Sequence, residues 1–135
     1  MKKHLAIMSH SAIEAVLSGK KTIETRFSKK RIAPFGQISS GDLVYMKIPG
    51  GEILGQFRVK KVFFFENLEP DDIEELFKKY DQKLSVGEPE FDRKYQTEKK
   101  NSSFGTLIFV ADSERFITSP IKIKKSDLRG WMVLS

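Results

Sequence analysis

Residues 18–26 read Ser-Gly-Lys-Lys-Thr-Ile-Glu-Thr-Arg, and this stretch says most about the fold. Gly19 is well placed to end a helix, because glycine accepts the left-handed backbone conformation found at helix C-termini. From Thr22 on, β-branched residues mix with charged ones, which predicts a strand over residues 22–27. The stretch therefore predicts a helix that leads directly into a charged strand.

Upstream of Gly19, the sequence supports this helix and places another strand before it. Residues 4–8 form a short apolar run typical of a buried strand. Ser11 and Glu14 then have the spacing of a capping box, in which two side chains satisfy free backbone N–H groups at the start of a helix. Together with apolar residues at helical spacing, this predicts a helix over residues 11–18.

Downstream of the charged strand, the pattern predicts a β-hairpin and a second helix. Residues 43–48 and 52–65 are strand-like runs joined by Pro-Gly-Gly at 49–51, and glycines accept the positive φ angles of a tight turn. A helix is predicted over residues 70–80, because Pro70 suits the first turn and the acidic residues after it suit the positive end of the helix dipole.

The last part of the chain is less regular. Residues 81–103 are polar and weakly periodic, with a short helix predicted over 92–98. Three further strands are predicted over residues 104–110, 116–123 and 131–134. Several short strands around two helices, without regular β-α-β alternation, favour the α+β class and a small mixed β-barrel with flanking helices. We find no repeat or linker and expect residues 1–135 to form a single domain.

Composition limits the kinds of site. Hydrophobic residues make up 39% of the 135 residues, which is enough for one packed core. The lack of cysteine excludes disulfides and thiolate sites, and two histidines are too few for a multi-histidine site, so we expect no cofactor and no such metal centre. Carboxylate-held Mg²⁺ or Ca²⁺ stays open. No apolar run approaches the roughly 20 residues that span a bilayer, so we expect a cytoplasmic protein without a membrane partner.

Charge is distributed unevenly along the chain, whose formal net charge is +6. Residues 1–61 carry a net charge of +8, residues 62–92 of −7 and residues 93–135 of +5. Basic ends and an acidic middle indicate that one face attracts anions while the acidic segment lies elsewhere. The alternative is solvated surface charge without a binding role.

Lys21, Glu24 and Arg26 are the candidate functional cluster. In an alternating strand Thr22, Glu24 and Arg26 share one face, and Lys21 lies at the bend before it, so an acid and two cations could meet in one cleft. Glu24 would orient the cations, leaving their donors for a phosphate or a base edge. The alternative is a cross-strand ion pair between Glu24 and Arg26 on an exposed sheet face.

The same stretch carries a family resemblance. The order of strand, helix and residues 18–26, followed by Gly-Asp-Leu-Val at 41–44, resembles the ASCH domain family, which has the PUA-like fold. Residues 123–131, Ile-Lys-Lys-Ser-Asp-Leu-Arg-Gly-Trp, resemble that family's closing strand. The resemblance covers nearly the whole chain, and its most specific part is Gly-Lys-Lys-Thr-Ile-Glu-Thr-Arg at 19–26. It implies a small PUA-like β-barrel with flanking helices.

The resemblance also implies a cleft beside the first helix, proposed across the family to bind RNA in translation-related or regulatory roles. Lys21, Glu24 and Arg26 match the family's cleft motif. Some bacterial members are amidohydrolases acting on N4-acetylcytidine, using a lysine and a threonine from the stretch that aligns with residues 21–24, and a more distant glutamate that we cannot place here. Glu24 aligns with that threonine. A carboxylate is not the hydroxyl nucleophile of that mechanism, and this departure counts against the amidohydrolase activity.

Further candidates flank this cluster. Ser9 and His10, at the start of the first helix, offer a hydroxyl, an imidazole and free backbone N–H groups to an anion. Lys29, Lys30 and Arg31 could contact a nucleic-acid backbone next to the cleft. The alternatives are a capping or surface role for His10 and a solvated loop for the basic triplet.

Three functional hypotheses follow. The leading one is a binding module whose basic cleft holds RNA or a nucleotide-like ligand. The second is a hydrolase, either an amidohydrolase on an acylated nucleoside or a ribonuclease, with Lys21 and Glu24 as an acid–base pair. The third is a protein-interaction adaptor that uses the acidic segment 66–92. The sequence leaves the oligomeric state open.

Overall fold

The computed structural model of the chain describes residues 1–119, 121–123 and 128–135. Within these residues the protein has one six-stranded sheet, in the strand order β2-β5-β4-β3-β1-β6, and three helices. The elements are β1 (Lys3–Ile7), α1 (His10–Leu17), β2 (Ile23–Ser28), β3 (Leu43–Lys47), β4 (Ile53–Phe65), α2 (Pro70–Leu84), α3 (Pro89–Lys99), β5 (Phe104–Arg115) and β6 (Trp131–Val133).

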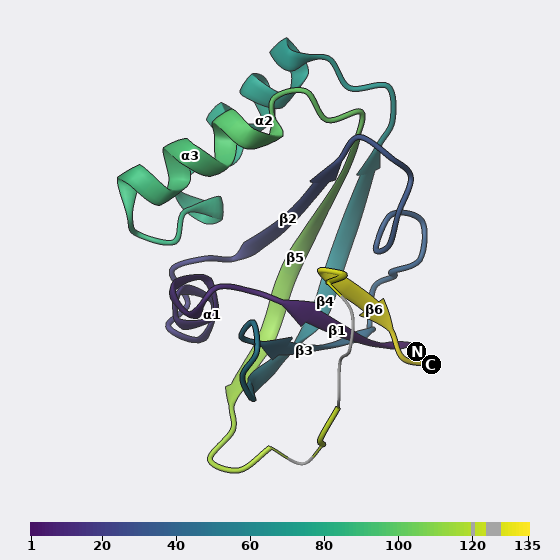
Figure 1. Cartoon of the computed structure of the whole chain (residues 1–135), viewed down its shortest axis with the longest axis vertical. Coiled ribbons are helices and arrows are strands. Elements are labelled where there is room, and N and C mark those ends of the chain that lie inside the picture. Colours follow the sequence, from purple (N-terminus) through teal and green to yellow (C-terminus); the bar gives the residue numbers. More distant parts are fainter. Residues whose placement is uncertain (120, 124–127) are drawn as a thin grey trace.

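The sheet is mixed and strongly curled. β1 runs parallel to β3, and the other described strand pairs are antiparallel. Figure 1 shows β1, β3 and β6 crossing β2 and the long strands β4 and β5 at a steep angle, which gives the sheet the shape of a half-barrel. The α+β class and the small mixed barrel expected from the sequence are confirmed, and β2 and β6 form the two edges of the curled sheet.

The helix α1 packs on the inside of the curl. Its apolar residues, including Ile13 and Val16, lie in the main core with Val44, Phe57 and other residues from the middle strands. The predicted capping box is wrong. Ser9 has an extended backbone and caps the helix, accepting a hydrogen bond from the N–H of Ala12 (3.1 Å). The helix therefore begins at His10, one residue earlier than expected, because Ser9 is the last extended residue and caps the helix.

The helices α2 and α3 cover the other side of β2 and β5 (Figure 1). α2 is longer than predicted because it continues past a kink at Asp81 (φ 4°, ψ −87°) to Leu84. α3 is also longer than the predicted short helix. A second core cluster forms beneath α2, built from Ile23, Phe27, Ile73, Phe77, Leu84 and Leu107.

One predicted strand is wrong. β5 continues to Arg115, where it pairs with Gly55 near the start of β4, and residues 116–119 and 121–123 are not in a strand. The reason is that β4 begins at Ile53 and offers no strand for β5 to pair with beyond this point. The apolar residues of this segment, such as Phe116, instead cover a third cluster on the outside of β1 and β3.

Candidate functional site

A cavity of about 210 Å³ lies beside the edge strand β2, where the start of α1 approaches α2 and α3. Its floor contains Lys21, Glu24, Thr25 and Arg26, the charged stretch singled out from the sequence. Aromatic and polar side chains from α2 and α3 form part of its wall: Phe77, Asp81, Phe91, Asp92, Tyr95, Gln96 and Lys99. The start of α1, the end of β1 and the loop after α2 supply further lining residues.

Lys21 and Glu24 are buried charges at the floor of this cavity. Their side chains are only 5% and 8% exposed, and Lys21 Nζ lies 3.6 Å from Glu24 Oε1. Lys21 Nζ also donates a hydrogen bond to the carbonyl oxygen of Leu84 (2.6 Å), at the end of α2. Glu24 Oε1 accepts the backbone N–H of Thr25 (3.0 Å). Burial of these charges is tolerated because each has an opposite charge and a hydrogen-bond partner.

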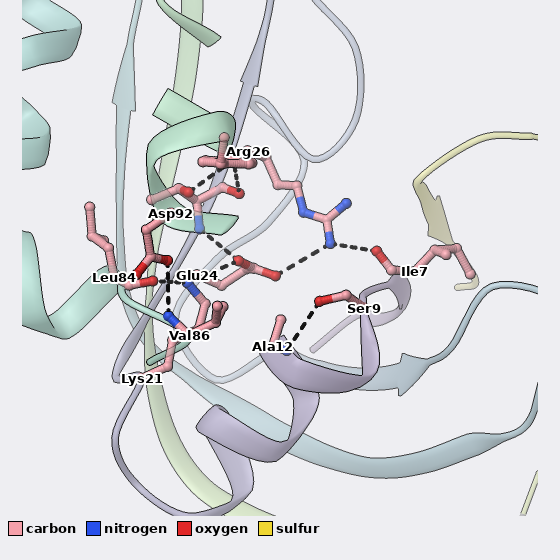
Figure 2. A network of polar contacts seen from close by, with 11 residues as sticks. Ile7, Ser9, Ala12, Lys21, Glu24, Arg26, Leu84, Val86 and Asp92 are labelled. Carbon is pink, nitrogen blue, oxygen red and sulfur yellow. Dashed lines mark hydrogen bonds and ion pairs between the residues drawn. The ribbon is translucent and has the colours of Figure 1, made fainter. Parts of the chain in front are cut away.

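Arg26 joins this pair to the far edge of the sheet, as Figure 2 shows in part. Its Nη2 lies 3.4 Å from Glu24 Oε2 and donates to the carbonyl oxygen of Ile7 (2.9 Å). Its Nη1 donates to the carbonyl oxygen of Gly130 (3.0 Å), directly before β6. Because β2 and β6 are the two edges of the sheet, one side chain spans the gap that would have to close to complete a barrel.

The charge state of Glu24 follows from these contacts. Burial raises its pKa, but the charges of Lys21 and Arg26, with the hydrogen bonds from Thr25 and Arg26, outweigh it and hold the pKa below its usual value of 4.5. Glu24 is therefore a carboxylate at neutral pH. A carboxylate accepts hydrogen bonds and is a weak base when its pKa is low.

A buried chain of ring contacts supports Arg26 from behind. Its guanidinium carbon lies 5.0 Å from the centroid of the Trp131 ring, and the indole N–H of Trp131 donates to His4 Nδ1 (3.0 Å). An indole nitrogen can only donate, so His4 Nδ1 must carry no proton, and Nε2 carries the proton that is donated to Asp42 Oδ2 (2.8 Å). His4 is thereby held in one neutral tautomer, fully buried.

Tyr95 connects α3 to the exposed edge of β2. Its hydroxyl donates to the backbone carbonyl oxygen of Thr25 (3.0 Å) and lies 3.0 Å from Thr25 Oγ1. Since the tyrosine proton goes to the carbonyl, the threonine hydroxyl donates to Tyr95 in return. Burial and the nearby charge of Glu24 raise the pKa of Tyr95 to about 12. None of the described side chains of Pro89–Lys99 is fully buried, and Tyr95 holds α3 in place both by these polar contacts and by packing edge-on against Phe77, with ring centroids 6.0 Å apart.

The other residues proposed from the sequence lie in different surroundings. Ser9 lines the cavity while it caps α1. His10 is exposed, 3.7 Å from Glu14 Oε1, and is not part of the cavity wall. Lys29, Lys30 and Arg31 are exposed on the loop after β2, outside the cavity wall, and Arg31 pairs with Glu66 (3.0 Å).

Sequence reasoning missed the helical wall of the cavity. Asp92 accepts hydrogen bonds from the Ser85 hydroxyl (2.5 Å) and the Val86 N–H (3.1 Å), and so fixes the loop between α2 and α3 beside Lys21. Tyr95 and Phe91 lie in a segment whose weak periodicity gave no sign of a packed face. Pro70 did predict α2, and the corresponding signal for α3, Pro89 in its first turn, was not used.

Metal-binding and membrane-spanning features are not found in the part of the chain that the structure describes. No three histidine or carboxylate side chains come together there in a way that could hold a metal ion. None of the helices among those residues has the length and apolar character required to cross a membrane.

Comparisons with known proteins give the fold and the family. A search of curated proteins finds no significant match. Among solved structures, the serine-to-alanine and tyrosine-to-phenylalanine variants of the ASCH protein from Zymomonas mobilis superpose with TM-scores of 0.72 and 0.71. Each is 14% identical, and the matches cover 99% and 100% of this chain and 89% and 91% of those chains. A protein from Enterococcus faecalis has a TM-score of 0.53 at 12% identity, over 90% of this chain and 87% of its own.

These structural similarities show the fold, and the family is shown by the sequence. The model of the ASCH domain matches residues 7–125, which include the charged stretch, the edge strand β2 and both helices of the cavity wall. This chain belongs to the ASCH domain family.

Proposed function

We propose that this protein binds RNA by taking one unpaired base into the cavity beside β2. The observation that carries the proposal is the buried carboxylate of Glu24, flanked by Lys21 and Arg26 at the floor of a cavity with aromatic walls. A base edge alternates donors and acceptors, and a carboxylate beside a lysine offers one partner of each kind.

The size and walls of the cavity support a single base. Its volume of about 210 Å³ lies below the roughly 300–1,000 Å³ typical of pockets for drug-sized ligands. The rings of Phe77, Phe91 and Tyr95 line it, and aromatic rings stack with bases in most single-stranded RNA sites. Phe91 is 38% exposed, so its ring is available at the mouth.

Positive charge at the mouth supports contact with the RNA backbone. Lys99 lines the cavity, and Arg26 on its floor is partly exposed. The exposed Lys29 and Lys30 follow β2, the strand that forms the floor, and we propose that they add contacts to phosphates that are independent of RNA sequence. His10 has no role in this proposal.

The hydrolase hypothesis receives less support from the same geometry. Acid–base work at neutral pH needs a group whose pKa lies near 7, and the pKa of Glu24 is lowered by its cations. Lys21 is committed to the carbonyl oxygen of Leu84 and to Glu24. Both residues are therefore better placed to hold a ligand than to exchange protons with it.

The test is a fluorescence-anisotropy titration of labelled single-stranded RNA at low and moderate salt. Lys99→Ala removes a cavity-wall cation, and Lys94→Ala is the matched control on the same helix, since Lys94 lies outside the cavity wall. We expect affinity to fall by a factor of about 3–10 for Lys99→Ala and to stay within about twofold of wild type for Lys94→Ala, because only the first change removes a charge from the site.

A second variant tests the base itself. Phe91→Ser removes a stacking ring from the mouth of the cavity, and we expect it to weaken RNA binding by about tenfold, the effect of losing one stacked base. Free nucleosides added in excess should compete with RNA if a base enters the cavity. RNA binding unaffected by Phe91→Ser and by all four nucleosides would refute the proposal, whereas nucleoside binding without RNA binding would identify a small-molecule site.

A further inference from the structure

A second concave surface lies on the opposite side of α2 from the cavity. This groove, of about 750 Å³, runs between α2 and the end of β4. Its wall is formed by apolar, acidic and basic residues: Phe65, Glu66, Leu68, Asp72, Glu75, Leu76, Lys78 and Lys79. None of them contributes to the cavity proposed to bind RNA.

An exposed aromatic strip continues the floor of the groove along β4. Lys61, Phe63 and Phe65 alternate on the strand and so face the same side of the sheet. The ring of Phe63 is 39% exposed and contacts the ring of Phe109 edge-on, with centroids 5.3 Å apart. Tyr80 of α2 contacts Phe109 in turn (5.9 Å), which joins the strip to the helix. Phe65 and Phe109 beside Phe63 are partly buried, so the rings form one contiguous, partly exposed apolar patch, which is typical of an interaction surface.

The two ends of the groove carry opposite charge. Glu66, Asp72 and Glu75 lie at the end next to Phe65, where α2 begins. At the other end, the ammonium of Lys61 lies 4.4 Å from the Phe109 centroid and that of Lys79 lies 5.4 Å from the Tyr80 centroid.

Glu75 is the carboxylate most available to a partner. Glu66 is paired with Arg31, and Asp72 accepts the backbone N–H of Glu69 as part of the helix cap. Glu75 forms no ion pair with any residue that the structure describes, and it lines the groove beside Leu76. A cation on a binding partner can therefore pair with Glu75 without displacing another charge.

We propose that this groove docks a protein segment that places apolar side chains on the strip, a basic residue at the acidic end and an acidic residue at the lysine end. Charge complementarity selects this occupant. At the acidic end Glu75, which has no ion-pair partner among the described residues, repels a phosphate and attracts an arginine or lysine. The apolar strip supplies the buried contact area that such charges alone do not.

The experiment is a selection of random displayed peptides on the full-length protein, followed by affinity measurements on the selected peptides. Glu75→Lys reverses the charge inside the groove, and Glu90→Lys is the matched control, because Glu90 is exposed on α3 outside the groove. We expect selected peptides to combine aromatic or aliphatic residues with a basic residue at one end. Glu75→Lys should weaken them by about tenfold or more, because it replaces an attraction with a repulsion.

Rescue makes the assignment specific. A peptide whose basic residue is changed to glutamate should bind the Glu75→Lys protein more tightly than it binds the wild-type protein. The inference is overturned if no peptide is enriched, or if Glu75→Lys and Glu90→Lys bind the peptides equally well. It is also overturned if Lys61→Glu and Phe63→Ser abolish binding of labelled RNA, since the groove would then be a nucleic-acid surface.

Discussion

Replacing Glu24 with glutamine should destabilise the protein strongly, although the change is nearly isosteric. The amide has one oxygen where the carboxylate has two, so either the side facing Thr25 and Lys21 or the side facing Arg26 meets an NH₂ donor instead of an acceptor. In the first case Lys21 would keep only its bond to the Leu84 carbonyl oxygen. Removing one partner of a buried ion pair costs about 3–5 kcal/mol of unfolding free energy. Water can enter the adjoining cavity and solvate the unpaired cation, so we expect a cost at the lower end of this range, about 3 kcal/mol.

The measurement is the free energy of unfolding in urea at neutral pH, with Glu74→Gln as control. Glu74 pairs with Lys78 at 3.3 Å on the exposed face of α2, and the same chemical change there should cost under about 0.5 kcal/mol. Because the folded-state pKa of Glu24 is lowered, its contribution is present above the unfolded-state value of about 4.5 and is lost as pH falls through the folded pKa. The difference between wild type and Glu24→Gln should therefore narrow in acid.

Two results would contradict this reasoning. If Glu24→Gln were no less stable than Glu74→Gln, the carboxylate would not be compensating the buried cations. If the difference between wild type and Glu24→Gln were the same at pH 3 as at pH 7, the stabilisation would not depend on ionisation of Glu24.

Three further changes test the surroundings of the site. In an ultraviolet titration, Tyr95 should ionise only near pH 12. The free energy of unfolding should fall as pH rises from 10 towards 12, because the tyrosine ionises in the unfolded chain before it ionises in the folded protein. Tyr95→Phe, which releases the Thr25 carbonyl, should remove this pH dependence. Trp131→Phe should cost about 1–3 kcal/mol in urea unfolding, since it leaves the buried His4 Nδ1 without a donor. Gly105→Ala should lower the free energy of unfolding by about 1–3 kcal/mol, because the added methyl group would lie 2.7 Å from a carbon of the Phe27 ring. Unchanged stability would show that this ring moves aside freely.

Local sequence patterns predicted much of the fold. Gly19 does end a helix, with φ of 81°, and Gly50 has φ of 66° in the turn between the two central strands. The family resemblance and the α+β class are confirmed. These features were accessible because they depend on neighbours within a few residues, where backbone preferences act directly.

The same short range explains the errors. Residues 116–123 have the alternation of a strand, but a strand needs a partner, and the pattern reports only that one face is buried. The floor of the cavity was predictable because strand periodicity places Glu24 and Arg26 together. The helical wall of the cavity was not predictable, because local patterns do not report a contact such as that between Tyr95 and Thr25, which are 70 positions apart in the sequence.

The bridge that Arg26 makes between β2 and the residue before β6 would link the closure of the sheet to the RNA binding proposed above. A ligand that competes for this guanidinium loosens the closure of the sheet, so some of its binding energy is spent on deformation. If RNA binds at this cavity as proposed, a change at Arg26 affects folding and recognition at once. A substitution that improves recognition at the expense of closure should be tolerated only alongside a compensating change elsewhere along the seam, such as at Trp131.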